Sequence, residues 1–483
     1  MSPRARATKP EPLYQQVAGR LAALIESGTL RPGDRVPSLR RVSGQQRVSL
    51  STTLQAYGVL ESRGLIEARP QSGFYVRPRL ELLTPRPQRP PVPSATTKVD
   101  LASVLSTLLR AAADPTLVGL GAAAPSAELL PGRKLARLIG PILRRNAGHD
   151  AYSTAPGLPE LRRELARRAV DWGALLSPDD IVTTCGGTEA LYLALRAVTS
   201  PGDTVIVESP AYFGVLLLLQ ELGLKAVEVP TLPESGLSIE ALRTALTRHR
   251  VQACVAAFNC HNPLGFVMAD EAKREIVELL ARHQVPLIED EVYGDLAFGD
   301  ARARPAKAFD HHGLVLYCSS FSKTIAPGYR VGWIAGGRFH ARIVDLKFTT
   351  TLATPTLPQL AIAAFLRGGA FDRHLREMRG ACQRQVELMR EAIGRGFPAG
   401  TRVTRPAGGF LLWVEMPAEV DSLRLFDEAL AEGISITPGS VFSARLRLRN
   451  CIRLNCGRPW TEAVEKAVAT LGRLATAQLR RTA

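Results

Sequence analysis

The chain has 483 residues, which is too long for one ordinary domain and predicts two or three domains. With 46% hydrophobic and 22% charged residues it can bury a large core, and this composition excludes a wholly disordered chain. Residues 1–98 hold 16 basic and 6 acidic residues, so they carry +10 of the formal net charge of +16. Because a basic module suits a polyanionic partner, this asymmetry predicts a nucleic-acid-binding module at the N-terminus.

The cysteines and the apolar runs indicate the compartment. The seven cysteines are scattered without a C-x-x-C pair, so we expect neither a disulfide framework nor a metal site. The first residues contain no apolar core of a signal peptide, and the apolar run 215–219 is too short to cross a bilayer. We therefore expect a cytoplasmic protein with no membrane partner.

The N-terminal part shows the pattern of three helices followed by a hairpin. Apolar residues recur at three- and four-residue spacing over residues 13–25, which predicts a first helix. Ser38 is the expected N-cap of a second helix, and Ser49 or Ser51 that of a third. Two short apolar pieces within residues 65–76, with a glycine between them, predict a small hairpin. This order predicts a mainly helical winged helix-turn-helix.

The same stretch resembles the DNA-binding module of the GntR superfamily. The matching marks are Leu30-x-Pro-Gly-Asp-x-Val-Pro-Ser-x-Arg40, Val48-Ser49-x-x-Thr52, Tyr57-x-x-Leu60-x-x-x-Gly64-Leu65-Ile66 and Ser72-Gly73-x-Tyr75-Val76. The resemblance implies that the third helix enters the major groove of double-stranded DNA and that the wing approaches the minor groove. The residues expected at the DNA are Arg35, Ser38, Arg40, Arg41, Arg47, Ser49, Ser51, Thr52, Thr53 and Gly73, with the arginines on phosphates. Leu50 stands where family members often carry a basic residue, so one contact is expected to be missing. The alternative is a solvated basic face with no DNA to bind.

Residues 78–98 are rich in proline with interspersed arginines. Such a sequence favours extended polyproline geometry and predicts a semi-rigid, solvated spacer of about 3 Å per residue. The expected organisation is therefore a DNA-binding domain at 10–77, a linker at 78–98 and a large domain at 99–478.

In the large domain, short apolar runs alternate with helical stretches, which indicates an α/β fold with a largely parallel sheet. The runs are 205–207, 226–229, 253–258, 286–288, 314–317 and 331–334. Ligands of such sheets bind at the carboxyl ends of the strands, so polar residues just past the runs are candidates for a site.

Four such stretches carry chemistry, and each also has an ordinary interpretation. Glycines 186 and 187 open a helix whose free N–H groups could bind a phosphate, although many helices begin with glycine. Tyr212 could stack on a flat ring or pack in the core. Asp290 follows an apolar run, where a carboxylate is costly unless paired, and a pyridinium nitrogen would supply the partner. Lys323 lies among small hydroxylated residues and could form a Schiff base, yet Ser-x-x-Lys also occurs in serine acylases and in solvated loops.

In this order the stretches resemble the class I and II aminotransferases of fold type I, over residues of about 100–475. The resemblance implies an α/β domain with a mainly parallel sheet, a smaller C-terminal α+β subdomain, and the cofactor pyridoxal 5'-phosphate (PLP). Carried over, Lys323 is the Schiff-base lysine and Asp290 pairs the pyridine nitrogen. The other implied PLP contacts are Asn262 and Tyr293 on the phenolic oxygen, Tyr212 on the ring, and Gly187, Thr188, Ser320 and Arg330 on the phosphate.

Two further positions complete this resemblance. Arg453, in the stretch Cys451–Asn455, matches the arginine that binds the substrate carboxylate, and its planar fork suits that group. Leu264 departs from the pattern, because threonine usually follows the Asn-Pro pair of the family.

Together the two halves resemble the MocR/GabR group of transcriptional regulators. The resemblance implies a homodimer that binds promoter DNA and senses an amine or amino acid through PLP. Two alternatives remain: PLP itself is the effector, or the chain is a working aminotransferase that carries a DNA-binding module.

Overall fold

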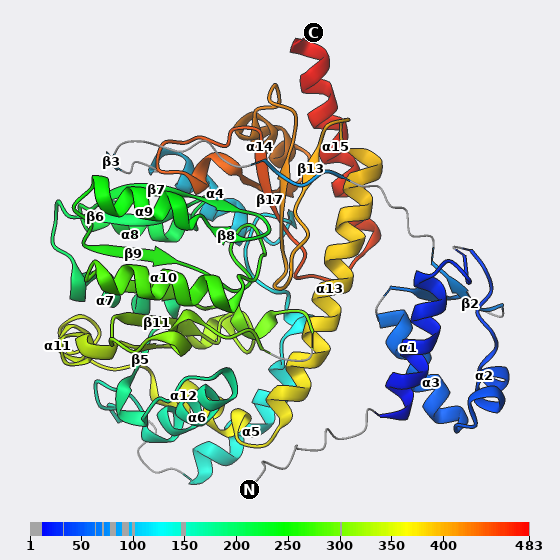
Figure 1. Cartoon of the computed structure of the whole chain (residues 1–483), viewed down its shortest axis with the longest axis horizontal. Helices are drawn as coiled ribbons and strands as arrows, with labels where there is room; N and C mark the ends of the chain where they lie inside the picture. Colours follow the sequence, from blue (N-terminus) through cyan, green and yellow to red (C-terminus); the bar gives the residue numbers. More distant parts are fainter. Residues whose placement is uncertain are drawn as a thin grey trace, which may run out of the picture. The chain divides into compact units, whose positions relative to one another are not determined.

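The computed structural model describes residues 12–31, 33–62, 64–69, 72–77, 84–88, 96–98, 102–145, 151–299 and 302–482. The chain divides into two compact units, Met1–Leu82 and Leu83–Ala483 (Figure 1). In the described part of the chain, no helix is long and apolar enough to cross a membrane.

The first unit contains three helices and a hairpin, as the sequence predicts. Its elements are α1 (Leu13–Glu26), α2 (Leu39–Gln46), α3 (Leu50–Ser62), β1 (Ile66–Arg69) and β2 (Gly73–Val76). The side-chain oxygen of Ser49 accepts a hydrogen bond from the backbone N–H of Thr52 at 3.0 Å, so Ser49 caps α3. The two hairpin strands pair antiparallel, with Ile66 opposite Val76.

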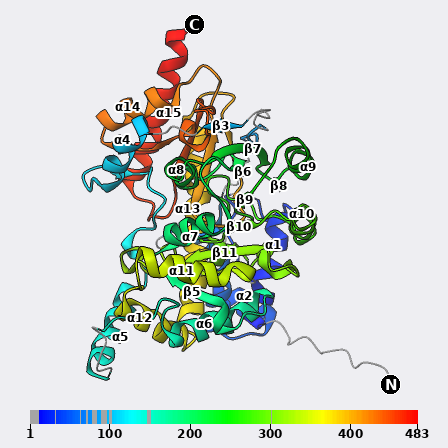
Figure 2. The same cartoon turned by 90° about the vertical axis from the view of Figure 1, so that its left-hand side faces the viewer.

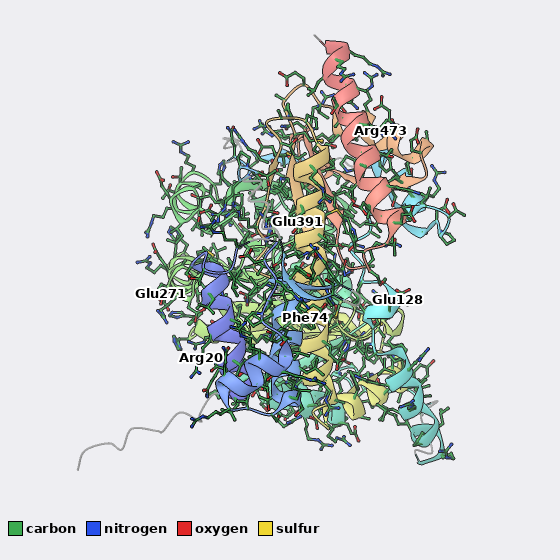
Figure 3. The ribbon with its side chains drawn as sticks, turned by 90° about the vertical axis from the view of Figure 1, so that its right-hand side faces the viewer. Arg20, Phe74, Glu128, Glu271, Glu391 and Arg473 are labelled. Atoms are coloured by element: carbon green, nitrogen blue, oxygen red, sulfur yellow. The ribbon has the colours of Figure 1, made fainter. Side chains whose placement is uncertain are left out.

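Tyr57 of α3 lies at the centre of this small core. Its ring is fully buried and meets Phe74 of β2 edge to face, with 5.0 Å between the ring centres (Phe74 is labelled in Figure 3). Its hydroxyl donates to the backbone carbonyl of Pro37, and burial raises the pKa of Tyr57 to about 12. One side chain therefore fixes α3 against both the start of α2 and the wing.

Within the described residues, the second unit is built on a nine-stranded sheet of order β3-β7-β6-β9-β10-β11-β12-β5, with β8 paired to β7. Its strands are β3 (Thr97–Lys98), β5 (Ile181–Thr184), β6 (Thr204–Ser209), β7 (Lys225–Leu232), β8 (Gly236–Leu237), β9 (Ala253–Ala256), β10 (Leu287–Asp290), β11 (Val315–Ser320) and β12 (Gly332–Ala335). The strands β7, β6, β9, β10 and β11 are parallel, and β12 runs antiparallel to both β11 and β5. The expected mainly parallel sheet is confirmed.

Helices cover both faces of this sheet. In Figure 2, α7 (Gly187–Val198) and α11 (His340–Thr350) lie on one side, and α9 (Ile239–Arg248) and α10 (Asp270–Arg282) on the other. Strand β6 shows the consequence, because Ile206 joins one hydrophobic core while Val205 and Val207 join the other. A strand buried on both faces reads as a continuous apolar run, which is why these strands are visible in the sequence.

A smaller subdomain follows, as expected, with an antiparallel sheet of order β13-β14-β17-β16. Its strands are β13 (Arg402–Val403), β14 (Leu411–Glu415), β16 (Thr437–Pro438) and β17 (Cys451–Asn455). The long helix α13 (Ala370–Gly396), which carries Glu391, and α15 (Glu462–Thr482), which carries Arg473, run side by side (Figure 3). Strand β4 (Val118–Gly119) pairs with β15 (Ile434–Ser435), so a segment that lies between β3 and β5 of the large sheet joins the small subdomain.

The remaining helices of the second unit complete these layers. They are α4 (Ala102–Ala113), α5 (Gly132–Arg145), α6 (Pro159–Ala169), α8 (Phe213–Glu221), α12 (Thr356–Leu366) and α14 (Ser422–Ala431).

Part of the proline-rich linker is held by the second unit, so the expectation of a solvated spacer is wrong for Thr84–Gln88. The carbonyl of Pro85 accepts from the N–H of Val403 at 2.9 Å, and the N–H of Gln88 donates to Glu415 Oε2 at 2.6 Å. Pro87 is buried, and Arg86 forms an ion pair with Glu234. Proline has no N–H group but keeps its carbonyl, so the prolines of this segment can still accept hydrogen bonds. Their carbonyls can therefore pair with the edge of the small sheet at β13. Residues 78–83 and 89–95 of the expected linker lie outside the described residues.

Candidate functional site

The N-terminus of α3 carries a cluster of hydroxyl groups. Ser49 Oγ lies 2.8 Å from Ser51 Oγ and 2.7 Å from Thr52 Oγ1, so three of the residues expected at the DNA lie together. Thr53 does not join them: its side chain is fully buried, and its hydroxyl donates to the carbonyl of Ser49 at 3.1 Å. Its position one residue further round the helix turns it toward the core, so its side chain cannot reach a nucleic acid.

Four exposed arginines lie on the same unit. Arg40 and Arg41 belong to α2, which Ser38 caps through a 3.4 Å hydrogen bond from the Arg41 N–H, and Arg47 follows the end of that helix. Arg35 lies against the wing, since a Cβ added at Gly73 would stand 3.4 Å from its Nε. Gly73 has a φ of +105°, a conformation that glycine adopts readily. None of the four arginines forms an ion pair with any residue that the structure describes.

In the second unit, Asp290 is the last residue of β10 and faces a small cavity. Its Oδ1 is buried and has no hydrogen-bond partner among the described residues. Burial raises the pKa of Asp290 to about 6, and the nearby Glu208 carboxylate adds to this effect. An orphaned carboxylate oxygen at a strand end is a place for a ligand that donates a proton or a hydrogen bond.

Lys323 lies in the turn after β11, the strand beside β10. Its Nζ donates to the carbonyl of Ala123 at 2.7 Å and lies 5.8 Å from the ring centre of Tyr293. Burial and the positive charge of Arg453 lower the pKa of Lys323 to about 8. A lysine with such a pKa is available as a neutral amine, which is the form that attacks a carbonyl.

The cavity beside Asp290 brings further predicted residues together. Tyr212, Asn262 and Tyr293 line it with Asp290. The Tyr212 ring packs over Gly214, where a Cβ would lie 2.5 Å from the ring. The Tyr293 hydroxyl donates to the carbonyl of Ala123 at 3.4 Å, so it shares an acceptor with Lys323.

The N-terminus of α7 provides a site for an anion. No side chain caps this helix, and Gly186 at its N-cap has a φ of +84°. Arg330 packs so closely on Gly186 that any side chain there would collide with its guanidinium, which donates to the carbonyl of Cys185 at 3.2 Å. Gly187 lies against Ser320, the last residue of β11. Free N–H groups, a hydroxyl and an arginine therefore converge as a phosphate requires. Thr188, also predicted there, is the exposed second residue of α7.

Arg453, in β17, is 1% exposed. Its Nη1 donates to Asn262 Oδ1 at 3.0 Å, and its Nη2 donates to the carbonyl of Gly121 at 2.6 Å and to Thr437 Oγ1 at 3.2 Å. All three acceptors are neutral, its Nε has no hydrogen-bond partner in the part of the chain that the structure describes, and burial lowers the pKa of its guanidinium. Among the described residues no carboxylate pairs with this buried cation, which favours an acidic ligand.

Sequence reasoning missed several groups at this site. The carbonyls of Gly121 and Ala123 carry no side-chain signal and come from a segment about 200 residues before Lys323. His261 is buried beside Asn262, with its Nε2 3.2 Å from Glu208 Oε2 and its Nδ1 accepting from the Leu264 N–H at 3.2 Å. Its place directly before Asn262 and the Asn-Pro pair was the available signal.

Comparisons with known proteins agree with both units. Residues 13–76 match the family described as bacterial regulatory proteins, gntR family, and residues 120–471 match aminotransferase class I and II. The chain is 39% identical over 469 residues to the HTH-type transcriptional regulator YjiR of Escherichia coli (strain K12), covering 95% of this chain and 98% of YjiR. It is 40% identical over 463 residues to the regulator YdcR of the same strain, with the same coverage.

The second unit also resembles a solved structure in its fold. The alpha-aminoadipate aminotransferase LysN of Thermus thermophilus matches with a TM-score of 0.73 and 26% identity, covering 80% of this chain and 97% of LysN. The family matches thus account for both units, and the two E. coli regulators match along nearly the whole chain. The chain belongs to the MocR/GabR group of transcriptional regulators, in which a GntR-family winged helix-turn-helix is joined to a class I and II aminotransferase domain.

Proposed function

We propose that the second unit binds PLP on Lys323 and that an amine, an amino acid or PLP itself controls how the chain binds promoter DNA. The observation that carries this proposal is the meeting of three ionisable groups that form no ion pair with any residue that the structure describes. Within that part of the chain, Asp290 has a buried oxygen without a hydrogen-bond partner, Lys323 has an amine of lowered pKa, and Arg453 is a buried cation without an acid. These groups also influence one another electrostatically, so they belong to one site.

The residues present fit PLP part by part. The free Oδ1 of Asp290 suits a protonated pyridine nitrogen, and the Tyr212 ring suits a stacking partner. The N-terminus of α7, with Ser320 and Arg330, suits the phosphate. The LysN structure, which shares this fold, is complexed with N-(5'-phosphopyridoxyl)-L-leucine.

When bound, PLP supplies a reactive carbonyl and an electron-withdrawing ring. The chain supplies the rest: Lys323 offers its amine, and Asp290 holds a proton for the ring nitrogen. Asn262 and Tyr293 face the same cavity and orient the phenolic oxygen. Arg453 binds the carboxylate of an amino-acid effector with a guanidinium already held by Asn262 and Thr437. An effector would shift DNA binding only by the difference between its affinity for the chain in its DNA-binding state and its affinity for the chain in its other state.

At the DNA, α3 enters the major groove and the four arginines hold phosphates. Hydroxyls of Ser49, Ser51 and Thr52 lie at the end of α3 that would meet base edges or phosphates. Leu50 and Leu54, both more than half exposed on α3, add apolar surface of the kind that thymine methyl groups contact.

A homodimer is part of this proposal. Tyr152 is 88% exposed and Phe348 61% exposed. The segment of Tyr152 contacts the start of α12, since Thr356 Oγ1 donates to the Ala151 carbonyl at 3.1 Å, and Phe348 lies in α11, the preceding helix. Large apolar side chains exposed to this degree suit an interaction surface, and a second copy of the chain is the occupant that a symmetric assembly supplies.

The alternative function is a working aminotransferase that carries a DNA-binding unit, since the groups for such chemistry are in place. The regulators YjiR and YdcR, which match nearly the whole chain, favour regulation. Turnover of amino-acid and keto-acid pairs at metabolic rates, together with no promoter binding, would favour the enzyme.

The opposite pKa shifts of Asp290 and Lys323 predict how stability depends on pH in PLP-free protein. Between pH 3.8 and about 6, folded Asp290 keeps a proton that the unfolded chain has lost, so the free energy of unfolding falls as pH rises. Between about 8 and 10.5, unfolded Lys323 keeps a proton that the folded chain has lost, so the free energy of unfolding rises with pH. In total, each of the two pKa shifts changes the free energy of unfolding by about 3 kcal/mol, at about 1.4 kcal/mol per pKa unit.

Asp290→Asn should remove the first of these effects. Relative to wild type, the loss of stability between pH 4 and 6 shrinks by about 2 kcal/mol, because residue 290 no longer carries a carboxyl that ionises. Urea unfolding of PLP-free protein measures it through tryptophan fluorescence, since all four tryptophans lie in the second unit. Asp345→Asn, at an exposed carboxylate of α11, serves as the control and should behave like wild type. Equal pH slopes in Asp290→Asn and wild type would contradict the pKa assignment.

Lys323→Ala should abolish the absorbance of covalently attached PLP and the response of DNA binding to PLP or amines. Lys225→Ala, at an exposed lysine, should keep both. Absorbance spectra and electrophoretic mobility shifts with promoter DNA measure the two effects. A variant at Lys323 whose DNA binding still responds to ligand rules the scheme out.

Arg453→Met should separate effectors by their carboxylate. The affinity for L-leucine falls about 100-fold, because a charged hydrogen-bonded pair contributes about 1.5–3 kcal/mol, whereas the affinity for 3-methylbutylamine stays the same. The absorbance of bound PLP, followed while each ligand is added, measures both affinities. Equal losses of affinity for the two ligands would show that Arg453 stabilises the fold and does not bind the carboxylate.

Arg40→Ala should weaken DNA binding by a similar factor on all sequences and lower the slope of log affinity against log salt by about 1. The slope is measured by fluorescence anisotropy over a range of salt concentrations. Arg373→Ala, an exposed arginine of the second unit, is the control with an unchanged slope. A loss confined to one base position would argue against a phosphate contact.

A further inference from the structure

The docked linker forms one wall of a cavity in the second unit. The cavity has a volume of about 470 Å³, within the range of small-molecule sites. Pro87 and Gln88 of the linker line it together with Trp413 and Glu415 of β14. The remaining wall includes Arg447, Leu448, Asn450 and Cys451.

The charges that line this cavity do not cancel. Arg402 and Arg447 contribute two cations, and Glu415 contributes one anion. Both oxygens of Glu415 are engaged, one with Arg402 Nη1 at 3.4 Å and the other with the N–H of Gln88 at 2.6 Å. Arg447 has no hydrogen bond or ion pair within the described part of the chain. It interacts electrostatically with Glu228, whose carboxylate accepts from the Ala444 N–H and whose pKa burial raises. Among the described residues, Arg447 is therefore a cation at the cavity that Glu228 influences only at a distance, without a hydrogen bond or an ion pair.

The backbone around Arg447 is strained in a way that holds it there. Leu446 and Leu448 have φ values of +51° and +60°, a region that L residues with branched side chains rarely adopt. Leu446 packs against the core under α7 and α8, and Leu448 packs against the core of the small subdomain. Because Leu446 and Leu448 pack in different cores, they hold Arg447 in place between them. Strain of this kind gathers at binding sites.

Several residues that line this cavity are close neighbours of residues in the candidate PLP site. Leu264 lines it, two residues after Asn262, and Pro210 lines it, two residues before Tyr212. Trp413 stands opposite Arg453 in the pairing of β14 with β17. An occupant would touch the linker on one side and the supports of the PLP site on the other.

We propose that this cavity is a second binding site, for a small carboxylic acid with an apolar body, and that its occupant holds Thr84–Gln88 on the small sheet. Arg447 binds the carboxylate, and Trp413, Leu448 and Pro87 contact the apolar part. The occupant thereby fixes the end of the tether that carries the DNA-binding unit. The site does not rest on the proposed PLP chemistry, and only its effect on DNA binding depends on the regulatory function.

The site is tested with 4-fluorophenylacetate as probe, on full-length protein with PLP, by ¹⁹F NMR. We expect saturable binding below about 10 mM, which Arg447→Met weakens at least tenfold. Arg449→Met is the matched control: Arg449 lies in the same loop, is exposed and pairs with Asp421, and should leave binding unchanged. Arg453→Met should also leave it unchanged, which separates this site from the carboxylate site proposed at Arg453. No saturable binding, undiminished binding by Arg447→Met, or loss of binding in Arg453→Met would each overturn the proposal.

The hold on the linker is tested by hydrogen exchange at Val403, whose N–H donates to Pro85. The probe should slow this exchange in wild type and not in Arg447→Met. Arg86→Glu, which places a second carboxylate beside Glu234, should speed the exchange at Val403 and lower the affinity for the probe several-fold. The double variant Arg86→Glu/Glu234→Arg should restore both the exchange rate and the affinity. Probe binding with unchanged exchange at Val403 would refute the role of the linker.

Discussion

A buried guanidinium that pairs with no acid among the described residues is the constraint on which the second unit depends. The hydrogen bonds of Arg453 join four parts of the chain: its own strand β17, the carbonyl of Gly121, the side chain of Asn262 and the hydroxyl of Thr437. Removing a cation from water costs several kcal/mol, and neutral acceptors offset this cost only in part. The fold therefore keeps a positive charge in place before any ligand arrives, and the segments that hold it are those that surround the proposed PLP site.

The parallel sheet explains how the other groups meet. Asp290 ends β10, and Lys323 follows β11, the neighbouring parallel strand, so both lie at the same edge of the sheet. Burial disfavours the charged form of each group, and this raises the pKa of the acid and lowers the pKa of the base. Two groups that could form an ion pair are thus brought toward their neutral forms. Such a pair is prepared to exchange protons with a ligand, which is what covalent binding of a cofactor requires.

The sequence predicts much of this because the signals are local. Helix spacing, caps and turn glycines predict the winged helix-turn-helix, and doubly buried strands appear as apolar runs. The candidate residues Asp290, Asn262, Tyr212 and Tyr293 stand in short motifs at strand ends, and the structure gathers them around one cavity. Thr53 shows the limit within a motif, because a step of one residue on a helix separates an exposed hydroxyl from a buried one.

By itself, the sequence determined which elements form and which side chains are candidates for the site, since periodicity and residue type are properties of short stretches. Only the tertiary structure decided that the carbonyls of Gly121 and Ala123 receive Arg453 and Lys323, and that Arg453 has no acid beside it among the residues described. It also decided that Thr84–Gln88 docks on β13 and β14. The physical reason is the same in each case. Backbone carbonyls and N–H groups are identical in nearly every residue, so their partners across long stretches of chain leave no trace in the order of the side chains.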